Sequence, residues 1–190
     1  MTLKALPNLL TLIRIAVVPV IVAVLMVRGD GASWCALVLF ALAGVTDYFD
    51  GWLARRLDAH SRFGALLDPI ADKLIVAAVL VMLIARGTVS GIDVLCIVVI
   101  LVRELAISGL REFLAAYRVT VPVSVLAKWK TTVQMVAIAL LLVPAGPDTL
   151  LRSSALSALW VAAALGLWTG ATYAAQTYPH WRIKAEDGTP

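Results

Sequence analysis

The sequence Asp47-Tyr-Phe-Asp50-Gly51-Trp-Leu-Ala54-Arg55 is followed, after eight residues, by Gly64-Ala-Leu-Leu-Asp68-Pro-Ile-Ala-Asp72. Apolar runs of helical length flank both pieces, so we expect the first aspartate pair at the end of one helix and the second pair at the start of the next. Asp47 and Asp50 are spaced i,i+3, and Asp68 and Asp72 i,i+4, so each pair lies on one helical face. The short connection makes these helices antiparallel neighbours and predicts that the four carboxylates converge at one depth.

The composition around this stretch is typical of a membrane protein. Of the 190 residues, 62% are hydrophobic and 15% are charged, whereas a soluble domain is about 45–50% apolar and about 25% charged. A membrane-spanning helix needs about 20 mostly apolar residues. Six segments meet this requirement, at residues 9–27, 33–54, 65–85, 92–115, 124–143 and 153–175. We therefore predict an all-α, polytopic membrane protein with six transmembrane helices and a short N-terminal interfacial segment, forming a single domain over residues 1–190.

The basic residues predict the orientation of these helices. Most Lys and Arg residues lie on the side shared by the N-terminus, the 55–64 loop, the 116–123 loop and the C-terminal tail, whereas the opposite side has Arg28, Arg86 and Arg152. An excess of positive charge marks the cytoplasmic side, so both termini are expected there. The net charge of +4 does not indicate nucleic-acid binding, because the cations lie at the ends of apolar segments rather than along a solvated stripe.

The four carboxylates indicate a metal site. Without a counterion they would repel one another and be costly to desolvate, and oxygen ligands of this kind are preferred by Mg²⁺ and Mn²⁺. The predicted ligands are Asp47, Asp50, Asp68 and Asp72. Two ions on four acids give near charge balance, and a bound diphosphate would complete their coordination. Gly51 and Ala54 leave room for a ligand beside Asp50, whereas Gly64 fits either that role or a turn.

These residues together resemble the signature of the CDP-alcohol phosphotransferase family. The pattern Asp47-x-x-Asp50-Gly51-x-x-Ala54-Arg55-x8-Gly64-x3-Asp68-x3-Asp72 fills every position of that signature. The resemblance implies a six-helix membrane fold, usually a homodimer, with a site that opens to the cytoplasmic side. It also implies two divalent metals on the four aspartates, Asp72 as the base, and transfer of a substituted phosphate from a CDP-linked molecule to an acceptor hydroxyl with release of CMP.

Further segments resemble one branch of the family, the bacterial phosphatidylglycerophosphate synthases of the inner membrane. They are Asn8-x-x-Thr11-x-x-Arg14, Arg103-Glu104-Leu-x-Ile-Ser108-Gly-Leu-Arg111-Glu112 and Lys128-x-Lys130-Thr131-Thr132-x-Gln134. In that branch the donor is CDP-diacylglycerol and the acceptor is glycerol 3-phosphate. The resemblance assigns to the donor the residues Asn8, Thr11, Arg14, Gly51, Ala54, Arg55 and Gly64.

Four cations in the second half of the chain fit an anionic acceptor. Glycerol 3-phosphate brings a dianionic phosphate beside the anionic diphosphate, and a neutral acceptor would not need extra cations. Arg103 and Arg111 are about 80° apart around a helix and can face one cavity, and Lys128 and Lys130 begin the next apolar segment. Arginine grips phosphate oxygens in a bidentate manner, and lysine acts as a point charge. Ion pairing with neighbouring carboxylates, or snorkelling of the lysines, is the alternative.

The sequence leaves two other functions open. The same fold could use inositol phosphate, inositol or serine as the acceptor, and inositol phosphate demands a similar cationic pocket. A divalent-cation transporter is a function of another class, since intramembrane acids often mark ion paths. A conduction path would place acids near mid-bilayer on several helices, whereas these four lie on two helices joined by a short loop.

Overall fold

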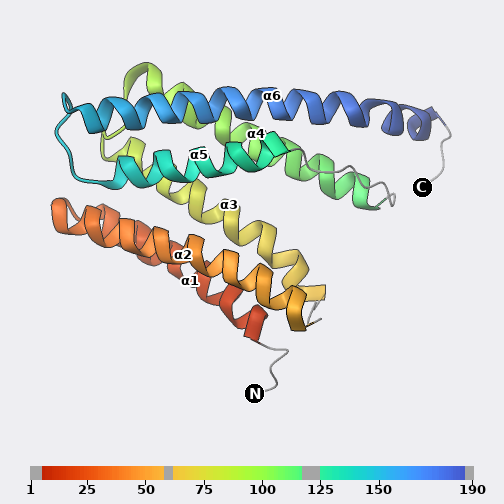
Figure 1. Ribbon diagram of the computed structural model, residues 1–190, viewed down its shortest axis with the longest axis horizontal. Helices are drawn as coiled ribbons and strands as arrows, with labels where there is room; N and C mark the ends of the chain where they lie inside the picture. The colour runs from red at the N-terminus through yellow and green to blue at the C-terminus, as the bar shows by residue number, and fades with distance from the viewer. Residues whose placement is uncertain (1–5, 58–61, 117–124, 187–190) are drawn as a thin grey trace. The chain divides into compact units, whose positions relative to one another are not determined.

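The computed structural model describes residues 6–57, 62–116 and 125–186, and the side chains at 11–47, 67, 70–115 and 126–178. The described chain is all-α, as predicted (Figure 1). Its elements are α1 (Leu6–Met26), α2 (Asp30–Leu57), α3 (Arg62–Ala85), the 3₁₀ turn η2 (Gly91–Asp93), α4 (Val94–Ala116), α5 (Val125–Leu142) and α6 (Leu150–Glu186). Most of the expected interfacial segment lies outside the described residues.

Each predicted apolar segment lies on one helix, but α6 is longer than predicted. The apolar run from 153 to 175 covers only the middle of this helix, which continues to Glu186. Apolarity identifies the part of a helix that suits a bilayer, whereas polar residues such as Gln176, Arg182 and Lys184 are good helix formers in their own right. The end of an apolar run is therefore a poor marker of where this helix ends.

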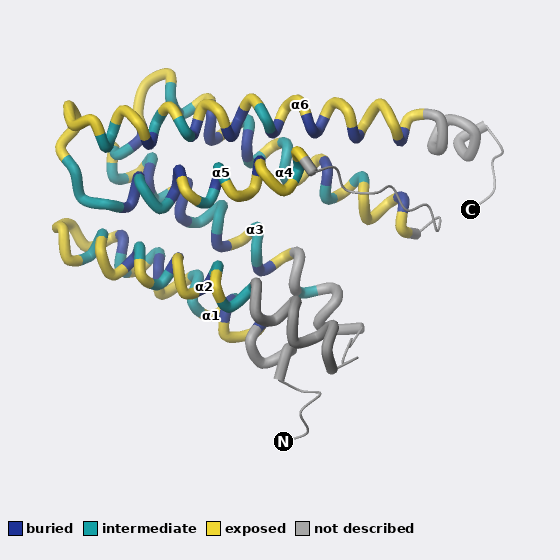
Figure 2. The backbone as a smooth tube through the Cα atoms, viewed as in Figure 1, coloured by how far each residue is buried: buried dark blue, intermediate teal, exposed yellow. Residues whose placement is uncertain are grey.

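The described helices have features of a membrane protein. Two stretches are long and apolar enough to cross a bilayer, namely Asp30–Asp47 of α2, with a mean hydropathy of 1.2, and Leu150–Tyr178 of α6, with 1.5. Large apolar side chains also point outward, including Leu42 at 56% exposure and Trp168 at 64%, and Figure 2 shows α6 with exposed residues along one side. Soluble monomers rarely leave such surfaces uncovered. The arrangement of six spans stays a prediction.

The chain divides into two compact units. The first comprises Met1–Ser90 with Ile138–Arg152, and the second comprises Gly91–Ala137 with Ser153–Pro190. In the first unit α1 packs against both α2 and α3, and fully buried side chains such as Ile21 on α1 form its core. In the second unit Ile107 and Leu114 of α4 cluster with Tyr173 of α6. The first unit therefore holds the signature aspartates, and the second holds the predicted acceptor cations.

A glycine motif ends α3. Gly87 has a φ of 72°, its N–H donates to the Ile84 carbonyl at 2.9 Å, and the Thr88 N–H donates to the Leu83 carbonyl at 2.9 Å. These two bonds are the Schellman pattern, which satisfies the last carbonyls of a helix. The turn fixes the chain direction directly after Arg86.

Replacing Gly87 by Ala is expected to lower the free energy of unfolding by about 1 kcal/mol, because an L-residue is strained at this φ. An added Cβ would meet no atom within 4 Å, so the cost is conformational rather than steric. Thermal unfolding in detergent measures the effect. Gly109→Ala, at an equally open position inside α4, is the matched control and should be neutral or stabilising. Equal effects of the two changes would contradict this account.

Candidate functional site

The signature aspartates lie on two helices that both pack against α1. Asp47 and Asp50 are in α2, and Asp68 and Asp72 are in α3, while α1 contacts both of these helices. The side chains of Asp47 and Asp72 are described and are 48% and 46% exposed. The side chains of Asp50 and Asp68 lie outside the described set. So do those of the predicted donor residues Asn8, Gly51, Ala54, Arg55 and Gly64.

Arg14 of α1 joins the two helices at the acids. Its Nη1 donates to Oδ1 of Asp47 at 2.7 Å and to Oδ1 of Asp72 at 2.6 Å. The Arg14 side chain is only 2% exposed, whereas both carboxylates are about half exposed. One guanidinium therefore offsets two negative charges that would otherwise repel each other. The predicted convergence of α2 and α3 carboxylates is confirmed for Asp47 and Asp72.

Thr11 lies one helical turn before Arg14 and is 1% exposed. Because residues three apart share a helical face, Thr11 and Arg14 both lie on the covered side of α1. The resemblance assigns both residues to the donor, which stays a prediction, and the structure shows Arg14 bonded to Asp47 and Asp72. An arginine within an apolar segment indicates a partner without identifying it, since arginine is almost never fully buried unpaired.

A second charged cluster lies on α4, α5 and α6. Glu104 accepts a hydrogen bond from Arg103 Nη1 at 3.0 Å and another from Lys130 Nζ. Arg103 also donates through Nε to the Gly166 carbonyl at 3.2 Å and through Nη2 to Thr169 Oγ1 at 3.1 Å. The Lys130 side chain is 3% exposed and that of Arg103 is 13% exposed. One carboxylate therefore holds two nearly buried cations together.

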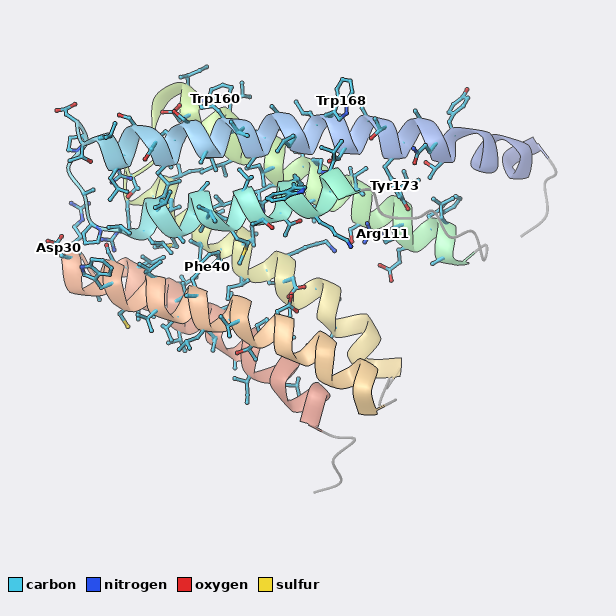
Figure 3. The ribbon with its side chains drawn as sticks, viewed as in Figure 1. Asp30, Phe40, Arg111, Trp160, Trp168 and Tyr173 are labelled. Carbon is cyan, nitrogen blue, oxygen red and sulfur yellow. The ribbon has the colours of Figure 1, made fainter. Side chains whose placement is uncertain are left out.

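The other two predicted acceptor cations lie apart from Glu104. The Arg111 guanidinium lies 5.9 Å from the centroid of the Tyr173 ring, and both residues are labelled in Figure 3. Arg103 and Arg111 thus both contact α6, and the shared cavity that their spacing suggests stays a prediction. Lys128 is exposed, and within the described part of the chain no ion pair joins it to the cluster around Glu104. The structure brings together Arg103 and Lys130 from the predicted set.

The sequence also matches a known family over most of its length. Residues 4–168 match the family described as CDP-alcohol phosphatidyltransferase. The chain belongs to this family. Membership confirms the resemblance that the aspartate signature indicated.

Relatives within the CDP-alcohol phosphatidyltransferase family are similar along nearly the whole chain. The chain is similar to CDP-diacylglycerol–glycerol-3-phosphate 3-phosphatidyltransferase of Rickettsia bellii, with 44% identity over 88% of this chain and 92% of the relative. The protein of the same name from Escherichia coli K12 is 41% identical over 88% of this chain and 91% of its own. The protein of the same name from Cereibacter sphaeroides is 48% identical over 77% of this chain and 66% of the relative.

The carboxylates of Asp47 and Asp72 have the chemistry of ligands for a divalent cation. Oxygens of Asp47 and Asp72, from different helices, lie within 2.7 Å of one atom, Nη1 of Arg14, so they can approach a common ion of the type that prefers oxygen ligands. Among the side chains that the structure describes, no group of three or more His, Cys, Asp or Glu residues is close enough to hold a metal. The described pair is therefore half of the expected ligand set.

Sequence reasoning missed the contribution of α6. Gly166, Thr169 and Gly170 surround Arg103, and a Cβ added at Gly170 would lie 3.2 Å from Arg103 Cγ. The two glycines are four residues apart in an apolar helix, a spacing that favours close packing of membrane helices. That spacing was the available signal for this contact.

Proposed function

We propose that this protein transfers the phosphatidyl group of CDP-diacylglycerol to glycerol 3-phosphate, giving phosphatidylglycerophosphate and CMP in phospholipid biosynthesis. The observation that carries the proposal is the meeting of two signature acids, Asp47 and Asp72, at Arg14. These acids meet in a member of the CDP-alcohol phosphatidyltransferase family. Relatives named CDP-diacylglycerol–glycerol-3-phosphate 3-phosphatidyltransferase are 41–48% identical to this chain. The names of these relatives support both the donor and the acceptor.

The proposed cofactors are two divalent ions, Mg²⁺ or Mn²⁺. The residues that would hold them are Asp47, Asp50, Asp68 and Asp72. When bound, such ions neutralise the diphosphate and lower the pKa of an attacking hydroxyl. Arg14 has a supporting role in this proposal, because it bonds both Asp47 and Asp72 and so fixes the direction of their carboxylates.

The donor is proposed to lie along the aspartate face. Gly51 and Ala54 make space for the cytidine end, and Arg55 offsets the charge of the diphosphate. The remaining proposed donor residues are Asn8, Thr11, Arg14 and Gly64. The acyl chains stay in the lipid, so the donor enters laterally from the inner leaflet.

The proposed reaction is a direct displacement at the β-phosphorus of the donor. The primary hydroxyl oxygen of the acceptor forms a bond to that phosphorus, and the bond from the phosphorus to the oxygen of the CMP group breaks. Asp72 accepts the hydroxyl proton as general base. CMP leaves with the electron pair of the broken bond, so no covalent intermediate with the protein is needed.

The acceptor phosphate is proposed to bind to cations of α4 and α5. Arg103 and Lys130 are the principal candidates, because Glu104 holds both of them and restricts their rotamers. Arg111 and Lys128 are further candidates from the same helices. A fixed guanidinium binds phosphate at a lower entropy cost than a mobile one.

The proposed setting is the bacterial inner membrane. The protein would be multi-pass, with six spans, both termini and the site on the cytoplasmic side, and would act as a homodimer. The positive charge at that side and the apolar outer surfaces of α2 and α6 support the membrane part of this proposal.

Purified protein should release CMP from CDP-diacylglycerol in the presence of Mg²⁺ and glycerol 3-phosphate, and EDTA should abolish the release. Parallel reactions with inositol phosphate, inositol or serine are the controls for the acceptor. Release with one of these instead would leave the metal site in place and contradict the proposed acceptor. A folded protein that releases no CMP with any acceptor would contradict the donor and favour ion transport.

A further inference from the structure

A second polar site lies at the opposite end of the first unit from the aspartates. A pocket of about 370 Å³ is lined by Asp30, Ser33, Arg86, Thr88 and Arg152 and by residues 141–146. Asp30, labelled in Figure 3, begins α2. Along α2 and α3, fourteen residues separate Ser33 from Asp47 and Asp72 from Arg86, which is about 20 Å of helix. The pocket is therefore distinct from the site around Arg14.

Backbone carbonyls hold both arginines of this pocket in place. Arg86 Nη1 donates to the carbonyls of Leu25 and Val27, each at 2.9 Å, and its Nη2 donates to Ser33 Oγ at 3.1 Å. Arg152 donates to the carbonyls of Thr88 and Ala145, each at 3.3 Å. Since Thr88 is two residues after Arg86, the Schellman turn places the carbonyl that Arg152 binds close to Arg86 in the chain, and both arginines line the pocket.

These hydrogen bonds fix the guanidinium groups without neutralising them. A carbonyl oxygen is uncharged, and none of the ion pairs among the described residues involves Arg86 or Arg152. Asp30 lines the same pocket, so one carboxylate faces two cations. A guanidinium has five N–H donors, and the bonds described use three from Arg86 and two from Arg152. Donors and positive charge therefore remain for a ligand.

We propose that this pocket binds an anionic phosphate group, either of a phospholipid whose headgroup carries a net negative charge or of free inorganic phosphate. Paired, fixed guanidinium groups match the planar, bidentate recognition of phosphate oxygens. The pocket volume lies within the range of about 300–1,000 Å³ that is usual for ligand sites, which leaves room for a glycerol group beside the phosphate. In the topology proposed above, the site faces the outer leaflet.

The test uses the full chain and two probes. In detergent, inorganic phosphate is titrated against chloride at constant ionic strength. In nanodiscs, phosphatidylcholine alone is compared with phosphatidylcholine plus phosphatidylglycerol. The readout is the ligand-dependent shift in the midpoint of thermal unfolding, because a ligand that binds the folded state raises it. A response to free phosphate identifies a soluble anion site, and a response to phosphatidylglycerol alone identifies a headgroup site.

Arg86→Gln and Arg152→Gln should each weaken the response by about tenfold or more in apparent Kd, as expected for a lost charged hydrogen-bond donor. Arg28→Gln is the matched control, because Arg28 is an exposed arginine of the α1–α2 turn that does not line the pocket. Lysine variants replace the glutamine variants if those do not fold, and should also bind more weakly. A response that is absent in the wild type, or unchanged in both pocket variants, would overturn the proposal.

Discussion

Asp72→Asn is expected to lower the rate of CMP release by about a thousandfold, because it removes both the proposed base and a charged metal ligand. The fold should survive the change. Asparagine has the shape of aspartate and its oxygen can still accept from Arg14, while Arg14 keeps its bond to Asp47 at 2.7 Å. Loss of one of two neighbouring negative charges also relieves repulsion. Thermal unfolding should therefore change little while kcat falls.

Two measurements separate the possible roles of Asp72. Binding of Mn²⁺, followed by electron paramagnetic resonance, reports on metal ligation independently of turnover. If Asp72 acts mainly as the base, the variant keeps its Mn²⁺ affinity and loses kcat. If it is mainly a ligand, the affinity falls as well. Asp148→Asn, the same change at an exposed loop position, should leave both unchanged. Turnover near the wild-type value in Asp72→Asn would exclude Asp72 as the base.

The aspartate pairs of the site around Asp72 could be predicted from the sequence, because each pair consists of residues close together in one helix. The spacing of Asp47 from Asp50, and of Asp68 from Asp72, is set by helical geometry alone. Apolar runs of spanning length located every helix to within a few residues, apart from the extension of α6. The same geometry placed Arg103 and Arg111 on one face of α4, and both contact α6.

Contacts between residues far apart in the sequence could not be predicted from helical spacing. Arg14 meets Asp72 across 58 residues, and Arg103 meets Thr169 across 66. Helical periodicity says which face a residue occupies but not which helix covers that face. Burial of a charged side chain implies a partner without identifying it, so the contacts of Arg14 with the two acids could not be predicted. Its role toward the donor stays a prediction.

Glu104→Gln is expected to have the second largest effect, because this carboxylate is shared by Arg103 and Lys130. A neutral amide removes one negative charge from beside Lys130, whose side chain is 3% exposed. Removal of one partner from a buried ion pair costs about 3–5 kcal/mol, and Glu104 is 21% exposed, so a loss of about 2 kcal/mol in unfolding free energy is expected. Midpoints of thermal unfolding in detergent measure this loss.

The same change should raise the KM for glycerol 3-phosphate by about tenfold while the KM for CDP-diacylglycerol changes little, since Arg103 and Lys130 lose the group that orients them. Glu112→Gln, an exposed position on the same helix, is the matched control and should change neither KM nor stability. Thr169→Val removes only one of the hydrogen bonds of Arg103 and should give a smaller rise in the same KM. A loss of stability in Glu104→Gln without a change in that KM would mean that the cluster supports the fold and that the acceptor phosphate binds elsewhere.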